Sequence, residues 1–154
     1  MGEPPRFDLL DVSAVRLGQQ ADDFRHAIRQ VGDVLVSVGA VSEDYVEAML
    51  EREQSISTFI GEGVAIPHGT LAGKAAVARD ALAVVQFPDG VDWHGDMVQV
   101  CIGIAAVGDG HIAILTQLAE ILMDEDRAAA LRAASSADEV VALLTPEREP
   151  GAIP

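Results

Sequence analysis

The chain has 154 residues and a formal net charge of −15, from 25 acidic and 10 basic side chains. This charge argues against nucleic acids and anionic membranes as partners, because both are bound through lysine and arginine. Protein partners with basic patches would instead be attracted. The length and an apolar content of 49 % predict one globular domain over residues 1–154, with a core over about 8–145 and loose termini.

The cysteine content and the hydropathy of the chain exclude further classes of protein. The single cysteine, Cys101, cannot form an internal disulfide, and its apolar surroundings in the sequence predict an inert buried thiol. No cysteine and histidine cluster has the spacing of a zinc site. The first residues lack the apolar core of a signal peptide, and the longest apolar run is too short to span a bilayer. We therefore expect a cytosolic protein without membrane insertion, cofactor or metal.

The first half of the chain predicts two helices after a weak strand candidate at residues 9–17. The first helix begins at about Ala21, with aspartates at its positive end and Gly39 as its stop. Ser42 is the expected N-cap of the second helix, which runs to Arg52-Glu53 and gives way to a Ser/Thr-rich link.

The second half predicts the strands of a sheet. Buried strands are expected at 64–66, 81–87 and 97–107, with a turn at 88–90 and a hairpin-like excursion at 91–95. Helices follow from His111 to about Leu122, from the cap Asp124 to Leu131, and from 138 to 144 after the cap Ser136. The mixture predicts an α/β fold of three layers, α/β/α, in which helices flank both faces of a small mixed sheet.

His68 stands at the end of the predicted strand 64–66. Pro67 has a fixed φ and no N–H, so it should end the strand and hold the imidazole out from the sheet edge. Gly69 should let a ligand approach the backbone beside the ring. An imidazole so placed can act as nucleophile, base or metal ligand, and a histidine bonded to a neighbouring carbonyl is the equally weighted structural alternative.

Two further residues are candidates for the same site. His111 follows a strand and a Gly-Asp-Gly turn and opens a helix, where unpaired N–H groups favour an anion. Arg52 lies at the end of the second helix, and a solvated arginine paired with Glu51 or Glu53 is its alternative. The other two histidines are predicted to be structural, His26 facing solvent and His94 in a surface loop.

Read together, several stretches resemble the enzyme IIA domains of the bacterial phosphoenolpyruvate:sugar phosphotransferase system, mannitol/fructose class. The stretches are Arg52-Glu53, Ser57-Thr58, Gly61 to Thr70 with its Ala-Ile-Pro-His core, Phe87 to Val91, Ile102 to Ala106, and His111-Ile112 with the leucines that follow. The resemblance covers about residues 8–145, and its Pro-His-Gly-Thr and Pro-Asp-Gly-Val segments look most like the mannitol branch.

The resemblance implies a phosphotransferase that works through a phosphohistidine. His68 would accept a phosphoryl group from the phosphocarrier HPr and pass it to a cysteine of the cognate enzyme IIB, and Cys101 does not match that cysteine. His111 and, with less support, Arg52 would stabilise the phosphate. The chain contains no IIB or membrane IIC segment, so we expect a free-standing IIA whose partners are other chains.

Two alternatives stay open at this point. A regulatory module of the nitrogen type would also be phosphorylated at His68 but would control other proteins. A metal hydrolase could use His68 and His111 with loop carboxylates, although no H-x-H or H-E-x-x-H spacing supports it.

Overall fold

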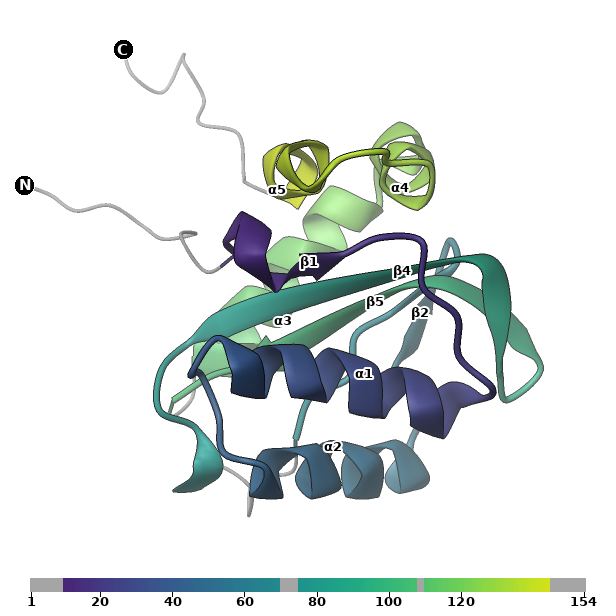
Figure 1. The fold of residues 1–154 in the computed structure, drawn as a ribbon. Helices are drawn as coiled ribbons and strands as arrows, with labels where there is room; N and C mark the ends of the chain where they lie inside the picture. The colour runs from purple at the N-terminus through teal and green to yellow at the C-terminus, as the bar shows by residue number, and fades with distance from the viewer. Residues whose placement is uncertain (1–9, 70–74, 108–109, 145–154) are drawn as a thin grey trace, which may run out of the picture.

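The computed structural model describes residues 10–69, 75–107 and 110–144 (Figure 1). Its centre is a five-stranded sheet in the order β1-β4-β5-β3-β2. The long central pair β4 and β5 is antiparallel, β1 runs parallel to β4, and β3 runs parallel to β5. The strands are β1 Val15–Arg16, β2 Phe59–Gly61, β3 Val64–Ala65, β4 Ala81–Trp93 and β5 Asp96–Ala105.

Helices lie on both faces of this sheet, which confirms the predicted three-layer α/β/α fold. One face is covered by α1 (Phe24–Ser37), with α2 (Asp44–Ser55) packed beside it (Figure 1). The other face carries α3 (Gly110–Leu122), α4 (Glu125–Arg132) and α5 (Ala137–Leu144). A short 3₁₀ helix, η1 (Val12–Ala14), leads into β1.

Local chemistry sets the ends of α1, which begins at Phe24, three residues after the predicted start at about Ala21. The carboxylate of Asp23 accepts the His26 N–H at 2.9 Å and caps the start of the helix. Gly39 follows its end with a φ of +78°, a conformation that glycine adopts without steric cost. Between these ends, Ile28, Val31 and Leu35 form a fully buried stripe on the sheet.

Two local predictions were wrong, and one strand was missed. Ser42 does not cap α2: Glu43 occupies the N-cap position without a side-chain bond, while the Ser42 N–H donates to the Ala76 carbonyl. The expected turn at 88–90 does not end β4, because a register shift between Gln86 and Val91 absorbs the extra residues as an irregularity within the strand. The short strand β2, which follows the predicted Ser/Thr-rich link, was not predicted.

Gly103 explains how α1 packs so closely on β5. A Cβ atom at this position would lie 2.9 Å from Cγ2 of Val31 and 3.4 Å from Cδ1 of Leu35. Real Cβ atoms essentially never approach that closely, so the glycine in this apolar strand makes room for the helix. The close packing holds α1 against the strand that also borders the candidate site.

We predict that Gly103→Ala lowers the free energy of unfolding by about 1–3 kcal/mol, because the added methyl group overpacks the α1–β5 contact. Urea denaturation measures the change. Adding Val31→Ala to the same chain should recover part of the loss, whereas a Gly103→Ala protein as stable as wild type would contradict this packing.

Candidate active site

His68 lies at the carboxyl end of the parallel pair β3 and β5. Beyond β3 the chain continues alongside β5, and His68 forms a parallel bridge with Ile104. The Ile104 N–H donates to the Pro67 carbonyl at 3.0 Å, so the proline contributes its acceptor to the sheet although it has no N–H to donate. The half-buried His68 is therefore fixed to the sheet edge by its own backbone.

The imidazole is oriented by a carbonyl group of its own segment. Nδ1 of His68 lies 2.9 Å from the Ile66 carbonyl oxygen. A carbonyl oxygen can only accept, so in the neutral ring this contact assigns the proton to Nδ1 and the lone pair to Nε2. The bond from the histidine to a neighbouring carbonyl, expected as the structural alternative, is thus present. By holding the proton on Nδ1, it places the nucleophilic lone pair on Nε2.

Tyr45 supports the backbone just after His68. The Tyr45 hydroxyl accepts the Gly69 N–H at 2.9 Å and donates to the Ile104 carbonyl at 2.7 Å. A Cβ atom on Gly69 would lie 2.5 Å from Cε1 of Tyr45. The glycine was expected to leave room for a ligand. In the structure the tyrosine ring fills that room, so Gly69 is required for packing.

His111 lies in the first turn of a helix that follows β5, as the sequence predicts. His111 is the second residue of α3, and its side chain lies outside the described residues. The helix begins five residues after β5 ends at Ala105, a gap of at most about 18 Å in extended chain. The amino end of α3 therefore follows the same sheet edge at which His68 bridges Ile104, and helix amino ends favour anions.

Arg52 lies in the last turn of α2, on a segment that leads toward His68. Its Nη1 donates to the Ile56 carbonyl at 2.8 Å. Two residues after Ile56, the Thr58 carbonyl accepts the Ile66 N–H at 3.0 Å, and His68 lies two residues beyond Ile66. In an antiparallel pair, the residues before one partner and the residues after the other lie on the same side of the pair. Ile56 and His68 therefore lie on the same side of the Thr58–Ile66 pair.

His26, Cys101 and His94 lie in the surroundings that were predicted for them. His26 is exposed near the start of α1. Cys101 is fully buried, and burial, reinforced by the negative charge of Glu53, raises the pKa of its thiol far above the ordinary range. His94 is exposed in the turn between β4 and β5, as predicted, and it also makes two contacts: its ring lies 4.3 Å from the Phe24 ring, and its Nε2 lies 3.1 Å from Glu53.

Glu53 is a buried charged residue whose burial was not predicted. Its side chain is almost fully buried, and it accepts hydrogen bonds from Thr58, Trp93 and His94. One signal was available in the sequence: Tyr45, Met49 and Glu53 recur at four-residue spacing, so the carboxylate lies on the apolar face of α2. A charge at such a position is buried only with partners.

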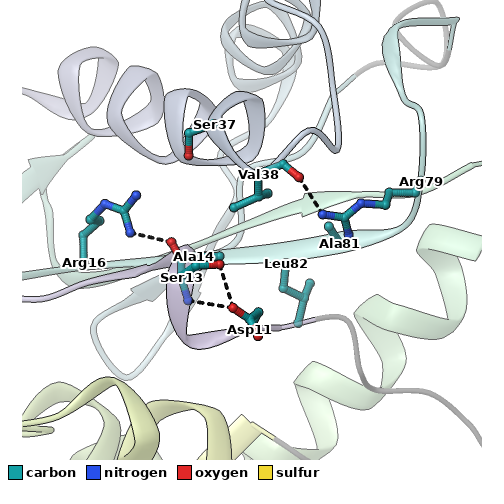
Figure 2. Close-up of a pocket in the computed structure, with 9 residues that line it drawn as sticks. All are labelled: Asp11, Ser13, Ala14, Arg16, Ser37, Val38, Arg79, Ala81 and Leu82. Atoms are coloured by element: carbon teal, nitrogen blue, oxygen red, sulfur yellow. Dashed lines mark hydrogen bonds between the residues drawn. The ribbon is translucent and has the colours of Figure 1, made fainter.

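A pocket of about 580 Å³ lies at the β1 edge of the sheet, apart from the predicted site residues (Figure 2). Its lining residues are Asp11, Ser13, Ala14, Arg16, Ser37, Val38, Arg79, Ala81 and Leu82. Figure 2 shows the two arginines on opposite sides, Arg16 bonded to the Ser13 carbonyl and Arg79 to the Val38 carbonyl. Both guanidinium groups are thus bonded to carbonyls at helix ends, those of η1 and α1.

The fold and the oriented imidazole define a small α/β domain with a candidate nucleophilic histidine at the carboxyl ends of parallel strands. A family model described as phosphoenolpyruvate-dependent sugar phosphotransferase system, EIIA 2, matches residues 8–146. The chain belongs to this family, as its resemblance predicted.

Curated relatives agree with the family. The chain is 45 % identical over 141 residues to a multiphosphoryl transfer protein of Escherichia coli O157:H7, covering 91 % of this chain and 38 % of that protein. The chain thus spans well under half the length of that relative. It is 38 % identical over 133 residues to the mannitol-specific phosphotransferase enzyme IIA component of Staphylococcus aureus, covering 86 % of this chain and 92 % of the relative.

Solved structures share the fold. The IIA mannitol protein of Escherichia coli, in a complex with phosphorylated IIB, has a TM-score of 0.83 at 37 % identity, covering 88 % of this chain and 98 % of that one. The nitrogen regulatory protein IIA-Ntr of Neisseria meningitidis has a TM-score of 0.79 at 28 % identity, covering 90 % of this chain and 97 % of that one.

In residues 10–69, 75–107 and 110–144, no helix has the length and apolar character needed to cross a membrane. Within the same ranges, no group of three or more His, Cys, Asp or Glu side chains is arranged to hold a metal ion.

The buried Tyr45 hydroxyl provides a test of the site's support. Burial raises the pKa of the phenol, and the hydrogen bond from the Gly69 N–H partly offsets that increase. Because Tyr45 is the only tyrosine in the sequence, ultraviolet titration at alkaline pH reports on it alone. We predict ionisation above pH 10 in the folded protein and a return to about 10 in denaturant.

The sign of the stability change follows from the same pKa. The folded state holds the phenolic proton more tightly, so the free energy of unfolding should fall as pH rises above about 10. Tyr45→Phe should remove this fall in the free energy of unfolding. Cys101→Ala is the control that measures any separate contribution of the buried thiol. A tyrosine that titrates identically in the folded and denatured protein would contradict the buried hydrogen-bonded phenol.

Proposed function

We propose that the protein is a phosphocarrier in which His68 accepts a phosphoryl group from phospho-HPr and passes it to the cysteine of a cognate enzyme IIB. The observation that carries this assignment is the Nδ1 contact with the Ile66 carbonyl, which leaves the Nε2 lone pair as the nucleophile. The neutral imidazole is the nucleophilic form, and in the tautomer assigned above its lone pair is on Nε2.

The proposed transfer balances with the groups named. The Nε2 lone pair of His68 attacks phosphorus, a P–N bond forms, and the donor's bond to phosphorus breaks with its electron pair leaving on the donor. In the second step a thiolate of IIB forms a P–S bond, and the P–N electron pair returns to Nε2. Positioning and stabilisation of charge on the phosphoryl oxygens supply most of the catalysis in such reactions.

Residues around His68 are suited to hold the phosphoryl oxygens. His111, in the first turn of α3, would donate a hydrogen bond beside the positive helix end. Arg52 would supply a guanidinium, since its described bond to the Ile56 carbonyl uses only Nη1 and leaves other N–H donors on the group. Both roles are proposals that rest on the positions of these residues and on the family resemblance.

The partners follow from the family and the charge. A solved neighbour is a IIA mannitol protein in complex with phosphorylated IIB, and a curated relative is named as mannitol-specific. We assign the same partner class, HPr and a mannitol-type IIB, to this chain, whose net charge of −15 favours basic docking surfaces. Because phosphoenolpyruvate is a cytoplasmic metabolite, we place the reaction in the cytoplasm.

A regulatory role is the second candidate, since IIA-Ntr of Neisseria meningitidis shares the fold. The identity of 28 % to that protein is lower than the 38 % shared with the crystal structure of IIA mannitol from Escherichia coli. The comparisons therefore favour transfer to IIB over regulation, and they do not favour a metal hydrolase.

The test is phosphorylation by labelled phosphoenolpyruvate with enzyme I and HPr. The wild-type protein should acquire an acid-labile, base-stable label, and His68→Ala should acquire none, because the nucleophile is missing. Addition of a mannitol-type IIB should remove the label from the wild type. Absence of label on the wild type would sink the carrier assignment, and label that cannot be passed to IIB would favour regulation.

Exposed His26 supplies the matched control. His26→Ala should behave as wild type in both steps, whereas His111→Ala should keep the fold and slow onward transfer by about tenfold or more, in line with the loss of one positioned donor. Equal rates for these two variants would show that His111 has no part in transfer.

A further inference from the structure

Glu53 joins three parts of the chain through one buried carboxylate. The residue is 3 % exposed. Its Oε1 accepts the Thr58 hydroxyl at 2.6 Å, and the Thr58 N–H lies 3.1–3.2 Å from both carboxylate oxygens. Its Oε2 accepts the Trp93 Nε1–H at 2.9 Å and lies 3.1 Å from His94 Nε2. The carboxylate therefore has one arm toward the β2 segment and one toward the β4–β5 hairpin.

The Thr58 arm continues to the nucleophile through hydrogen bonds. The Thr58 carbonyl accepts the Ile66 N–H at 3.0 Å. The Ile66 carbonyl in turn accepts from His68 Nδ1 at 2.9 Å. Each bond fixes the position of the residue that makes the next one, so the place of Thr58 sets the place of the carbonyl that orients the imidazole.

Glu53 also fixes the other side of the site. Arg52 precedes it in the last turn of α2 and bonds to the Ile56 carbonyl. The Glu53–Thr58 bonds close the segment between these residues into a short loop, with Ile56 near its middle. One buried carboxylate, that of Glu53, thus positions both the guanidinium proposed to hold phosphate and the carbonyl that orients His68.

We infer that Glu53 is a positioning residue for phosphoryl transfer at His68, acting through Thr58 and Ile66 on the orientation of the imidazole. The inference rests on the proposed carrier function. It also implies that the two sets of hydrogen bonds to the carboxylate have different roles. The Thr58 arm controls the reacting ring, and the hairpin arm to Trp93 contributes stability.

A carboxylate suits this position because both of its oxygens only accept hydrogen bonds, and every described partner presents a donor. Glutamine has nearly the same shape but only one accepting oxygen. An amide that keeps its oxygen on Trp93 places its NH₂ group at the Oε1 position, where the Thr58 hydroxyl and N–H lose an acceptor. Only the contact of the Thr58 N–H with the Trp93-bound oxygen is then left. Glu53→Gln should therefore loosen the Thr58 arm while leaving the hairpin arm in place.

The experiment compares Glu53→Gln with Glu51→Gln, which makes the same charge change at an exposed position of α2. The readouts are kcat and KM for transfer from phospho-HPr, and the tautomer of His68 from its ¹⁵N chemical shifts at a pH where the ring is neutral. Glu53→Gln should lower kcat by about tenfold or more, with KM within about twofold. It should also convert the Nδ1–H form of His68 into a mixture, whereas Glu51→Gln should match wild type.

Trp93→Phe separates positioning from stability. It removes the indole donor of the hairpin arm, so it should lower the urea midpoint but keep the Nδ1–H tautomer and at least half of kcat. Thr58→Val should reproduce the change of tautomer seen in Glu53→Gln, and it replaces that variant if Glu53→Gln does not fold. Equal loss of kcat in Trp93→Phe, or an unchanged tautomer in both Glu53→Gln and Thr58→Val, would overturn the inference.

Failure of the inference and failure of the carrier function give different results. The ¹⁵N measurement needs no phosphoryl donor, so it reports on the Glu53–His68 link even if the wild-type protein takes no label. A wild-type protein that is labelled, with Glu53→Gln labelled and transferring at the same rate, would overturn the positioning role alone.

Discussion

The pairing of residues 64–68 with β5 is the constraint on which the candidate site depends. Val64 and Ala65 pair with Val100 and Cys101, and the same parallel course carries His68 to Ile104. Because β5 is also the partner of β4 and lies under α1, the histidine is attached to the most buried part of the sheet. A phosphoryl acceptor needs this rigidity, since small displacements of a reacting atom are costly in rate.

The structure combines this rigidity with access. His68 is half-buried, and Ile56, two residues before Thr58 on the segment that pairs with Ile66, is 68 % exposed. A carrier has to present its histidine to two partners in turn, so its contact surface must be open and its affinity modest. The exposed apolar group and the strong negative charge are compatible with brief, electrostatically assisted encounters.

The sequence predicted those features that depend on neighbours within a few residues. The aspartates at the positive end of α1, the stop at Gly39 and the strand before Pro67 are local effects, and the structure contains all three. Helical spacing also predicted the buried stripe of α1. The family resemblance, rather than spacing, brought His68, His111 and Arg52 together as one site.

The features that escaped prediction depend on distant parts of the chain. Glu53 is buried because the irregular strand β4 brings Trp93 and His94 to the end of α2, and no local pattern shows that contact. Gly69 was assigned to ligand access, but the ring that occupies its space comes from Tyr45 on α2. In both cases a residue's neighbours along the chain were known and its neighbours in space were not.

The central claim is that the Ile66 carbonyl holds the proton on Nδ1 of His68 and so directs chemistry to Nε2. The most direct measurement is ¹⁵N–³¹P NMR of the phosphorylated protein, in which the coupling identifies the nitrogen bonded to phosphorus. Our account predicts coupling at Nε2, with Nδ1 still protonated. A phosphoryl group on Nδ1 would contradict it, because that bond requires the contact between His68 and Ile66 to break.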